Sequence, residues 1–546
     1  MQCGQLVKWP IWMTMCVIWC APLDASAQGT LQPVDYVQPV NWSKYDGIFG
    51  VQPGDTFGQK LVGVLQNESR YELNWVNSRY ELGDAAPYYP GVPYYWAYTN
   101  QSKSGNQKDI RPLASFAYGT ATLLATKIYS PSAAGISEAE ALNRTELAIR
   151  GVAFAHLSNT NDSRQFGGGG NTSAYNQAAY WTSQAASAAW LVWDRLSIDT
   201  RSAVANMVVY EADSFLNYTV PYWKLPSGAH ANPSDPGDTK AEENAWNAPL
   251  LALAQAMMPE HPNVTAWREK ASELQMSSYS NSTDITKTIL VDGKPVKDWV
   301  HGYNTFDDGV LVNHDIIHPD YFVSAVYTQT SSIVVESLAG QYIPQSTVYN
   351  LDKAYGGLTK VTFAQNADVT YETPTKPVVG PPYGQTIYQR TADDRYSADV
   401  YYPQGTDWTY KVTDAFLNTD LIAEWLKLDD GNDFDAMGWA AARLDAIIAL
   451  QSRSGTGKIY QTGDWLGTHA VVGEDEDFYR SNAIAWMQWW LMQNGQMSPI
   501  GDHWGALPTS APESSTFVFV LAAILVLIVV ALRRRGNAPI GNRPAT

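Results

Sequence analysis

The chain has few cysteines and few basic side chains for its length. Its 546 residues include 3 cysteines, and all of them lie within the first 20 positions. The remainder of the chain therefore has no disulfide, no thiol nucleophile and no cysteine-based metal site. Lys and Arg number 36 against 54 Asp and Glu, a net charge of −18. This balance excludes nucleic acid as a partner, because a phosphate backbone requires a basic surface.

Both ends of the chain are typical of targeting segments. Residues 1–27 combine a lysine, an apolar stretch and a small-x-small site, which predicts a secretory signal peptide. Residues 516–532 carry no charge and precede three arginines, which predicts a transmembrane segment followed by a basic cytoplasmic tail over 533–546. A sorting tail that is cleaved after export is the alternative. We expect an exported protein of the cell surface, with a linker over 501–515 and several Asn-x-Ser/Thr sites for glycans.

Between these ends the sequence is predominantly helical. Residues 28–107 are rich in Tyr, Pro, Gly and Asn, and we predict an irregular N-terminal segment that packs on the main body and holds one helix near 58–71. From 108 to 500, paired amphipathic segments predict an (α/α)6-type toroid of helical hairpins, with an α-solenoid as the alternative. The predicted helices lie near 112–129, 137–158, 176–196, 200–218, 240–258, 264–277, 319–339, 345–355, 412–428, 433–451 and 475–493.

A first polar cluster occupies residues 236–247, where a helix is predicted to begin. Thr239 and Glu242 have the spacing of a capping box, which explains Glu242 structurally. Glu243 and Asn247 lie one turn apart on a shared helix face, which makes them candidates for catalysis. The predicted substrate-binding residues of this region are Asn244, Trp246 and the nearby Trp223.

A second cluster occupies residues 306–321 and includes two of the eight histidines. His314, His318 and Tyr321 are candidates for proton transfer, because neighbouring groups can tune the pKa of His or Tyr. Asn313 is a candidate for substrate binding. We expect no metal here, because no third soft ligand is evident and Pro319 breaks the helical i, i+4 spacing that two histidine ligands would use.

A third cluster, residues 401–408, precedes another predicted helix. Asp407 either caps that helix or contributes a catalytic carboxylate. Tyr402 and Trp408 are predicted to bind substrate, because flat aromatic faces pack well on the C–H faces of sugar rings.

The first two clusters resemble the heparinase II/III-like polysaccharide lyases, which have an (α/α) toroid. Residues 243–247 look like that family's Asn-Asn-His-type motif, and residues 308–321 look like its Asp-Gly…Tyr-His-x-Tyr-type loop. Asn247 stands where the family's His would fall, and no C-terminal β domain follows. The resemblance implies β-elimination of a uronate-containing glycan. The Asn/Glu site would neutralise the uronate carboxylate, and Tyr321, helped by His314 or His318, would move the proton.

Two other functions use the same residues. In an inverting glycoside hydrolase, Glu243 would be the general acid and Asp407 the general base. In a non-catalytic surface protein, the aromatic side chains would bind glycans and the polar candidates would be scattered. A polysaccharide is the expected partner in all three cases, together with the membrane, and no cofactor is expected.

Overall fold

The computed structural model describes residues 31–97, 103–161, 166–169, 177–365, 371, 378, 383–408, 412–428, 435–461, 464 and 474–507. The predicted signal peptide, transmembrane segment and basic tail lie outside these ranges, so export and anchoring stay predictions from the sequence. Among the described helices, none combines the length and the apolar character that a membrane span requires.

Helices make up most of the described chain, as predicted. The α-helices are α1 (Thr56–Arg79), α2 (Lys103–Ala125), α3 (Pro131–Ala134), α4 (Glu138–Ala155), α5 (Ala178–Leu191), α6 (Ile198–Ser214), α7 (Ala241–Met257), α8 (Val264–Ser278), α9 (Val296–Trp299), α10 (Pro319–Ala339), α11 (Leu351–Thr359), α13 (Thr413–Leu426), α14 (Ala436–Ser452) and α15 (Glu474–Gln493). Short 3-10 turns are η1 (Pro33–Tyr36), η2 (Trp42–Tyr45), η4 (Trp193–Arg195), η5 (Ser282–Thr286) and η6 (Gln345–Val348).

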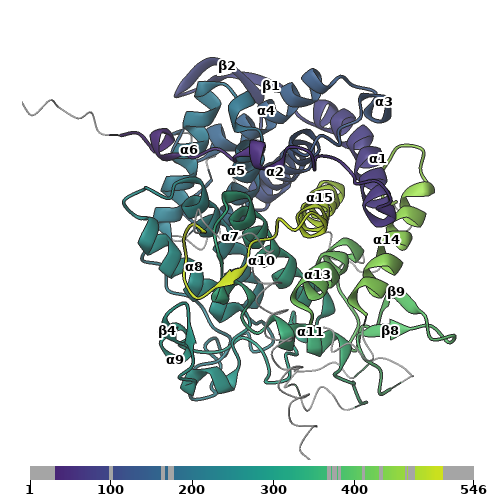
Figure 1. Cartoon of the computed structure of the whole chain (residues 1–546). Coiled ribbons are helices and arrows are strands. Elements are labelled where there is room, and N and C mark those ends of the chain that lie inside the picture. Colours follow the sequence, from purple (N-terminus) through teal and green to yellow (C-terminus); the bar gives the residue numbers. More distant parts are fainter. Residues whose placement is uncertain are drawn as a thin grey trace, which may run out of the picture.

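Six of the described helices form a closed inner ring. In cyclic order α2, α5, α7, α10, α13 and α15 each contact the next, and α15 returns to α2. The outer helices α1, α4, α6, α8 and α14 pack on the outside of this ring (Figure 1). Every residue of α5 is buried, which fits an inner position, whereas Ser137 and Ser197 cap the outer helices α4 and α6 in the ordinary way. The helical pairs therefore form a toroid.

The N-terminal segment is more regular than predicted. Residues 31–55 lie irregularly along the ring, where Gln38 N donates to Met257 O at 2.7 Å. The helix predicted near 58–71 is present as α1, which is longer at both ends, and its 24 residues form an outer helix packed on α14 and α15. Leu61, Leu65 and Leu73 carry its buried face. Frequent polar residues after residue 71 hide the helical period in its last two turns.

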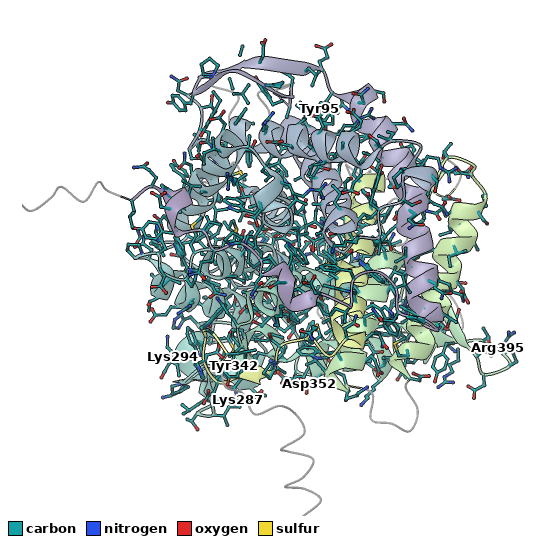
Figure 2. All side chains as sticks on the ribbon, turned by 45° about the horizontal axis from the view of Figure 1, so that its top comes forward. Tyr95, Lys287, Lys294, Tyr342, Asp352 and Arg395 are labelled. Carbon is teal, nitrogen blue, oxygen red and sulfur yellow. The ribbon has the colours of Figure 1, made fainter. Side chains whose placement is uncertain are left out.

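The strands are short and occur only as two-stranded pairs in the described chain. They are β1 (Leu82–Ala86) with β2 (Tyr89–Tyr95), β3 (Leu290–Val291) with β4 (Lys294–Pro295), β5 (Val312–Asn313) with β6 (Ile316–Ile317), β7 (Ile343–Pro344) with β10 (Ile500–Gly501), and β8 (Tyr388–Arg390) with β9 (Tyr396–Val400). Charged side chains such as Lys294, Asp352 and Arg395 lie at the periphery (Figure 2). The interior between the helices is the hydrophobic core.

Candidate functional site

The three polar clusters of the sequence meet at the N-terminal ends of α7 and α10. The chain that leads into α7 lies against the β5–β6 hairpin, where Asp315 N donates to Gly237 O at 3.2 Å. The third cluster is tied to the same hairpin, because Ile317 N donates to Gln404 Oε1 at 2.7 Å. Segments that are separated by up to about 170 positions in the sequence thus form one site.

The turn of the β5–β6 hairpin places His314 at its tip. His314 and Asp315 have φ of 50° and 63°, so both adopt the left-handed conformation of a two-residue type I′ turn. Asn and Gly usually occupy such positions, and a His there costs conformational energy that the surrounding structure must offset. Asn313 supports the turn, because its Oδ1 accepts a hydrogen bond from His314 N at 2.8 Å.

His314 connects a phenol to a carboxylate. Its Nε2 lies 3.0 Å from Tyr321 Oη, and its Nδ1 lies 2.9 Å from Asp407 Oδ2. The other carboxylate oxygen, Asp407 Oδ1, lies 2.9 Å from His318 Nε2. Four of the six predicted catalytic residues are therefore joined by direct hydrogen bonds. Trp408 completes the enclosure, with its ring edge-on to Tyr321 at 5.1 Å between centroids.

Charge and burial shift the pKa values of His314, Asp407 and Tyr321, and the shift of Asp407 is opposite to the other two. The hydrogen bond to Asp407 raises the pKa of His314. Burial alone would raise the pKa of Asp407. The hydrogen bonds from His314 and His318 outweigh this effect and lower the pKa below its ordinary value, so the carboxylate stays ionised. Burial raises the pKa of Tyr321 well above its ordinary value, and the charges of Glu242 and Asp238 add to this rise. Tyr321 therefore carries its proton at rest and can release it only toward a neighbour such as His314.

The first cluster is arranged differently from the prediction. Helix α7 begins at Ala241 with Lys240 as its N-cap and no side-chain cap, so the expected capping box of Thr239 and Glu242 is absent. Glu242 is buried instead, and burial followed by the charge of Glu243 raises its pKa well above the ordinary value. Glu243 is half-buried, and its carboxylate accepts from Lys240 Nζ at 3.1 Å. Glu242 is thus a carboxyl that favours its protonated form.

Several predicted substrate-binding residues serve the fold. Trp223 is only 2% exposed and donates from Nε1 to Pro236 O at 2.6 Å, so its predicted stacking surface does not exist. Asn244 is buried and donates to Pro221 O at 3.0 Å. Tyr402 donates from Oη to Asp320 Oδ1 at 2.9 Å. Trp246 is half-buried and stacks on Tyr180.

Asn247 is a buried residue of α7. It is 3% exposed, and among the described residues its Oδ1 has no hydrogen-bond partner. A buried polar atom without a partner is costly, and a ligand group is one way to satisfy it.

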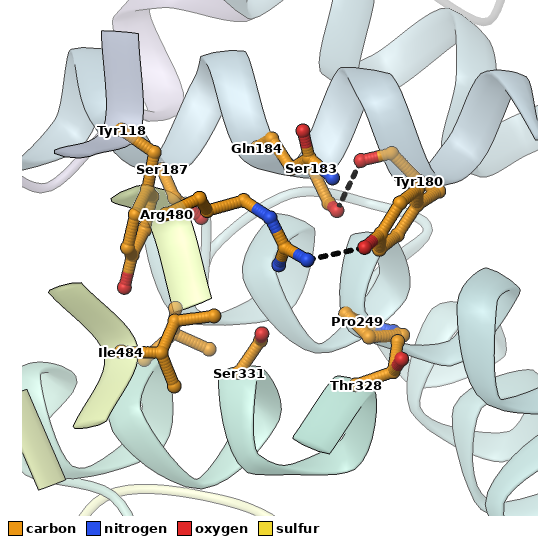
Figure 3. A pocket seen from close by; sticks show the side chains of 11 residues that line it. Tyr118, Tyr180, Ser183, Gln184, Ser187, Pro249, Thr328, Ser331, Arg480 and Ile484 are labelled. Carbon is orange, nitrogen blue, oxygen red and sulfur yellow. Dashed lines mark hydrogen bonds between the residues drawn. The ribbon is translucent and has the colours of Figure 1, made fainter. Parts of the chain in front are cut away.

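A buried cluster inside the ring escaped the sequence analysis. Arg111 of α2 and Arg480 of α15 both pair with Asp477, whose Oδ1 lies 3.4 Å from Arg480 Nε. Arg480 also donates to Tyr180 Oη (Figure 3). A second hydrogen bond from Arg480 reaches Tyr327 Oη at 3.0 Å. The cluster brings two guanidinium groups and one paired carboxylate together inside the ring, and the buried acids Asp414 and Glu242 interact electrostatically with it. The only signal in the sequence was the presence of arginines in inner, otherwise apolar helices.

The arrangement as a whole is suited to general acid–base chemistry. It holds a phenol that can pass its proton to an imidazole, an ionised carboxylate that orients this imidazole, and a protonated carboxyl on α7. Glu242 links the two groups of residues, because it lies close enough for electrostatic interaction with both Tyr321 and Arg111.

Comparisons with known proteins give little guidance. No family model and no curated protein matches the chain. Among solved structures, the chain is similar to the unsaturated glucuronyl hydrolase of Bacillus sp. GL1, which is responsible for the degradation of glycosaminoglycan. The two share 13% identity over 81% of this chain and 98% of that chain, with a TM-score of 0.34. This TM-score is too low to support an assignment of the fold, which depends on the contacts between the helices alone.

Proposed function

We propose that the protein is a polysaccharide lyase that cleaves uronate-containing glycans by β-elimination. The observation that carries this proposal is the hydrogen-bonded series Asp407–His314–Tyr321, with separations of 2.9 and 3.0 Å. A carboxylate that orients an imidazole, which in turn binds the reacting hydroxyl, is a general device for activating that hydroxyl. Here the activated group is a phenol, which suits proton abstraction next to a carboxylate.

The reaction assigns one role to each member of the series. Asp407 accepts from Nδ1 of His314, so that Nε2 is the nitrogen that accepts the proton of Tyr321. The Tyr321 oxygen then removes the proton from the carbon next to the uronate carboxyl. The electrons of that C–H bond form the new carbon–carbon double bond, and the glycosidic C–O bond breaks. The departing oxygen takes a proton from the same Tyr–His pair, so no water is consumed.

The developing charge on the uronate requires neutralisation, because the intermediate is an enediolate. Glu242 is buried beside the pair, and its raised pKa favours a protonated carboxyl that can donate a hydrogen bond to the substrate carboxylate. Arg111 and Arg480 supply positive charge deeper in the ring. These groups offset the acidic character of the chain where an anionic sugar would bind.

Glycoside hydrolysis is the second candidate, and the raised pKa of Glu242 favours it, since a general acid must hold its proton. The general base assigned from the sequence is less suitable. Both oxygens of Asp407 accept hydrogen bonds from histidines, which leaves the carboxylate poorly placed to activate water. Elimination therefore gives a role to both hydrogen bonds of His314, to Asp407 and to Tyr321, whereas hydrolysis does not.

A product assay tests the proposal. The purified protein is incubated with a panel of uronate-containing and neutral polysaccharides, and both ultraviolet absorbance and reducing ends are followed. Elimination creates an unsaturated uronate that absorbs in the ultraviolet, in step with new reducing ends. Reducing ends without absorbance would support the hydrolase. If no glycan gives either signal, a non-catalytic glycan-binding protein becomes the better account.

A further inference from the structure

His314, His318 and Asp407 are also arranged as ligands of a metal ion would be. One nitrogen of each histidine faces one oxygen of Asp407 at 2.9 Å, and one ligand atom from each of the three residues lies within 4.8 Å of the others. A tetrahedral zinc ion bound at about 2.0–2.1 Å separates its ligand atoms by roughly 3.3 Å. Small movements of these side chains would therefore admit such an ion.

The surroundings of His318 match those of a metal ligand. His318 is fully buried, and its second ring nitrogen, Nδ1, lies 3.7 Å from Asp320 Oδ2. Asp320 is itself buried and fixed by hydrogen bonds from Tyr402 at 2.9 Å and Thr406 at 3.0 Å. Histidines that bind metals commonly place their other nitrogen against a carboxylate, which fixes the orientation of the ring.

The opposite side of the cluster is open and negatively charged. The side chains of His314 and Asp407 are 35% and 34% exposed, which gives a path for an ion and room for water as a fourth ligand. Asp235 and Asp238, from the chain that leads into α7, act electrostatically on His314, and Lys240 Nζ, 2.7 Å from Asp238 Oδ2, offsets part of this charge. Their charge favours a cation at this position.

We propose that His314, His318 and Asp407 bind one divalent cation of the zinc class. Two imidazoles and one carboxylate suit zinc, whereas calcium and magnesium prefer sites made of oxygen ligands only. The ion would tie the β5–β6 hairpin to the segment before α13. Because Nδ1 of His314 cannot hold both a proton and a metal, the proton would then sit on Nε2. The hydrogen bond between His314 and Tyr321 would reverse its direction, so the metal-bound form would be distinct from the metal-free form in which His314 accepts the proton of Tyr321.

Metal titration tests this proposal without any assay of catalysis, so its result is separable from that of the proposed lyase activity. The full chain is stripped with a chelator and titrated with zinc chloride by calorimetry. The expected result is one zinc per chain. His318→Ala and Asp407→Asn are each expected to weaken binding at least 100-fold, and Asp320→Asn about 10- to 100-fold. His314→Gln, at the exposed hairpin tip, is the substitute ligand variant if a buried variant fails to fold, and it too is expected to weaken zinc binding.

The matched control is His503→Ala. His503 forms an exposed pair with Asp502, with Nδ1 2.6 Å from Oδ1, and so resembles a single surface histidine–carboxylate contact without the third ligand. Its removal is expected to leave zinc binding unchanged. Cobalt(II) in place of zinc is expected to give the visible absorption of a four-coordinate ion. No zinc binding, or binding that the three ligand variants leave intact, would overturn the proposal.

Discussion

Replacing Tyr321 by Phe removes one oxygen atom and leaves the ring in place. The lost atom is the partner of His314 Nε2 at 3.0 Å, and a hydrogen bond of this kind contributes about 1 kcal/mol to stability. The ring contacts with His318 and Trp408, at 4.6 and 5.1 Å between centroids, are retained. We therefore expect a fall in Tm of no more than about 2–4 °C for a protein of this size.

The effect on catalysis should be far larger than the effect on stability. Loss of a general acid–base group typically lowers the rate by about 100- to 10,000-fold, which corresponds to about 3–5 kcal/mol of transition-state stabilisation. The measurement is the initial rate of ultraviolet absorbance on the best glycan of the panel, alongside thermal unfolding. Tyr129→Phe is the matched control, since it also removes one hydrogen bond, from Oη to Ile136 O at 2.8 Å. A Tyr321→Phe protein within threefold of the wild-type rate would refute the assigned role.

Three further predictions concern other buried groups. Glu242→Gln keeps a hydrogen-bond donor but cannot give up a proton, so a lyase should lose less than about tenfold and a hydrolase about 100- to 10,000-fold in rate. Burial raises the pKa of Asp414 to about 7, so the folded protein holds this proton more tightly than the unfolded chain, and stability falls as pH rises from the unfolded toward the folded pKa. Between pH 5 and 8 the free energy of unfolding of the wild type should fall by about 2–3 kcal/mol relative to that of Asp414→Asn. Equal shifts of the urea midpoint with pH for the two proteins would contradict this. Arg443→Met leaves Asp420 buried without the guanidinium that lies 2.7 Å away, and urea unfolding at pH 8 should show a loss of about 3–5 kcal/mol; a loss below 1 kcal/mol would show that the pair is dispensable.

The helices of the ring could be predicted because their apolar period is strong and their ends are marked. Helix α10 begins at Pro319 and ends before Gly340, as its sequence indicates. Helix α1 was predicted only near 58–71, and its last two turns were missed because polar residues interrupt the apolar period there. Its position depends on packing against α14 and α15, which no local pattern reveals.

The candidate site was only partly predictable. His314, His318 and Tyr321 are close in sequence, but their link to Asp407 spans about 90 residues and depends on a two-residue turn with unusual backbone angles at His314. Whether Glu242 or Glu243 is the buried acid depends on the residue at which α7 begins. The sequence suggested a cap at Thr239, whereas the helix starts after Lys240, and this places Glu242 inside.

The pairing of Arg111 with Asp477 was out of reach of sequence reasoning. The two residues are 366 positions apart and meet only because the ring closes between α2 and α15. A charged residue in an inner helix signals a buried partner, but the partner's identity comes from the three-dimensional fold.

The source of the oxygen at the new chain end tests the central assignment most directly. The reaction is run in water labelled with heavy oxygen, and the products are weighed by mass spectrometry. The products are reduced at once, because the oxygen of any reducing end exchanges slowly with water. Elimination by Tyr321 and His314 predicts no heavy oxygen beyond this exchange, and an unsaturated fragment lighter than its hydrolytic counterpart by one water. One heavy oxygen in every cleaved pair, and no unsaturated fragment, would contradict it.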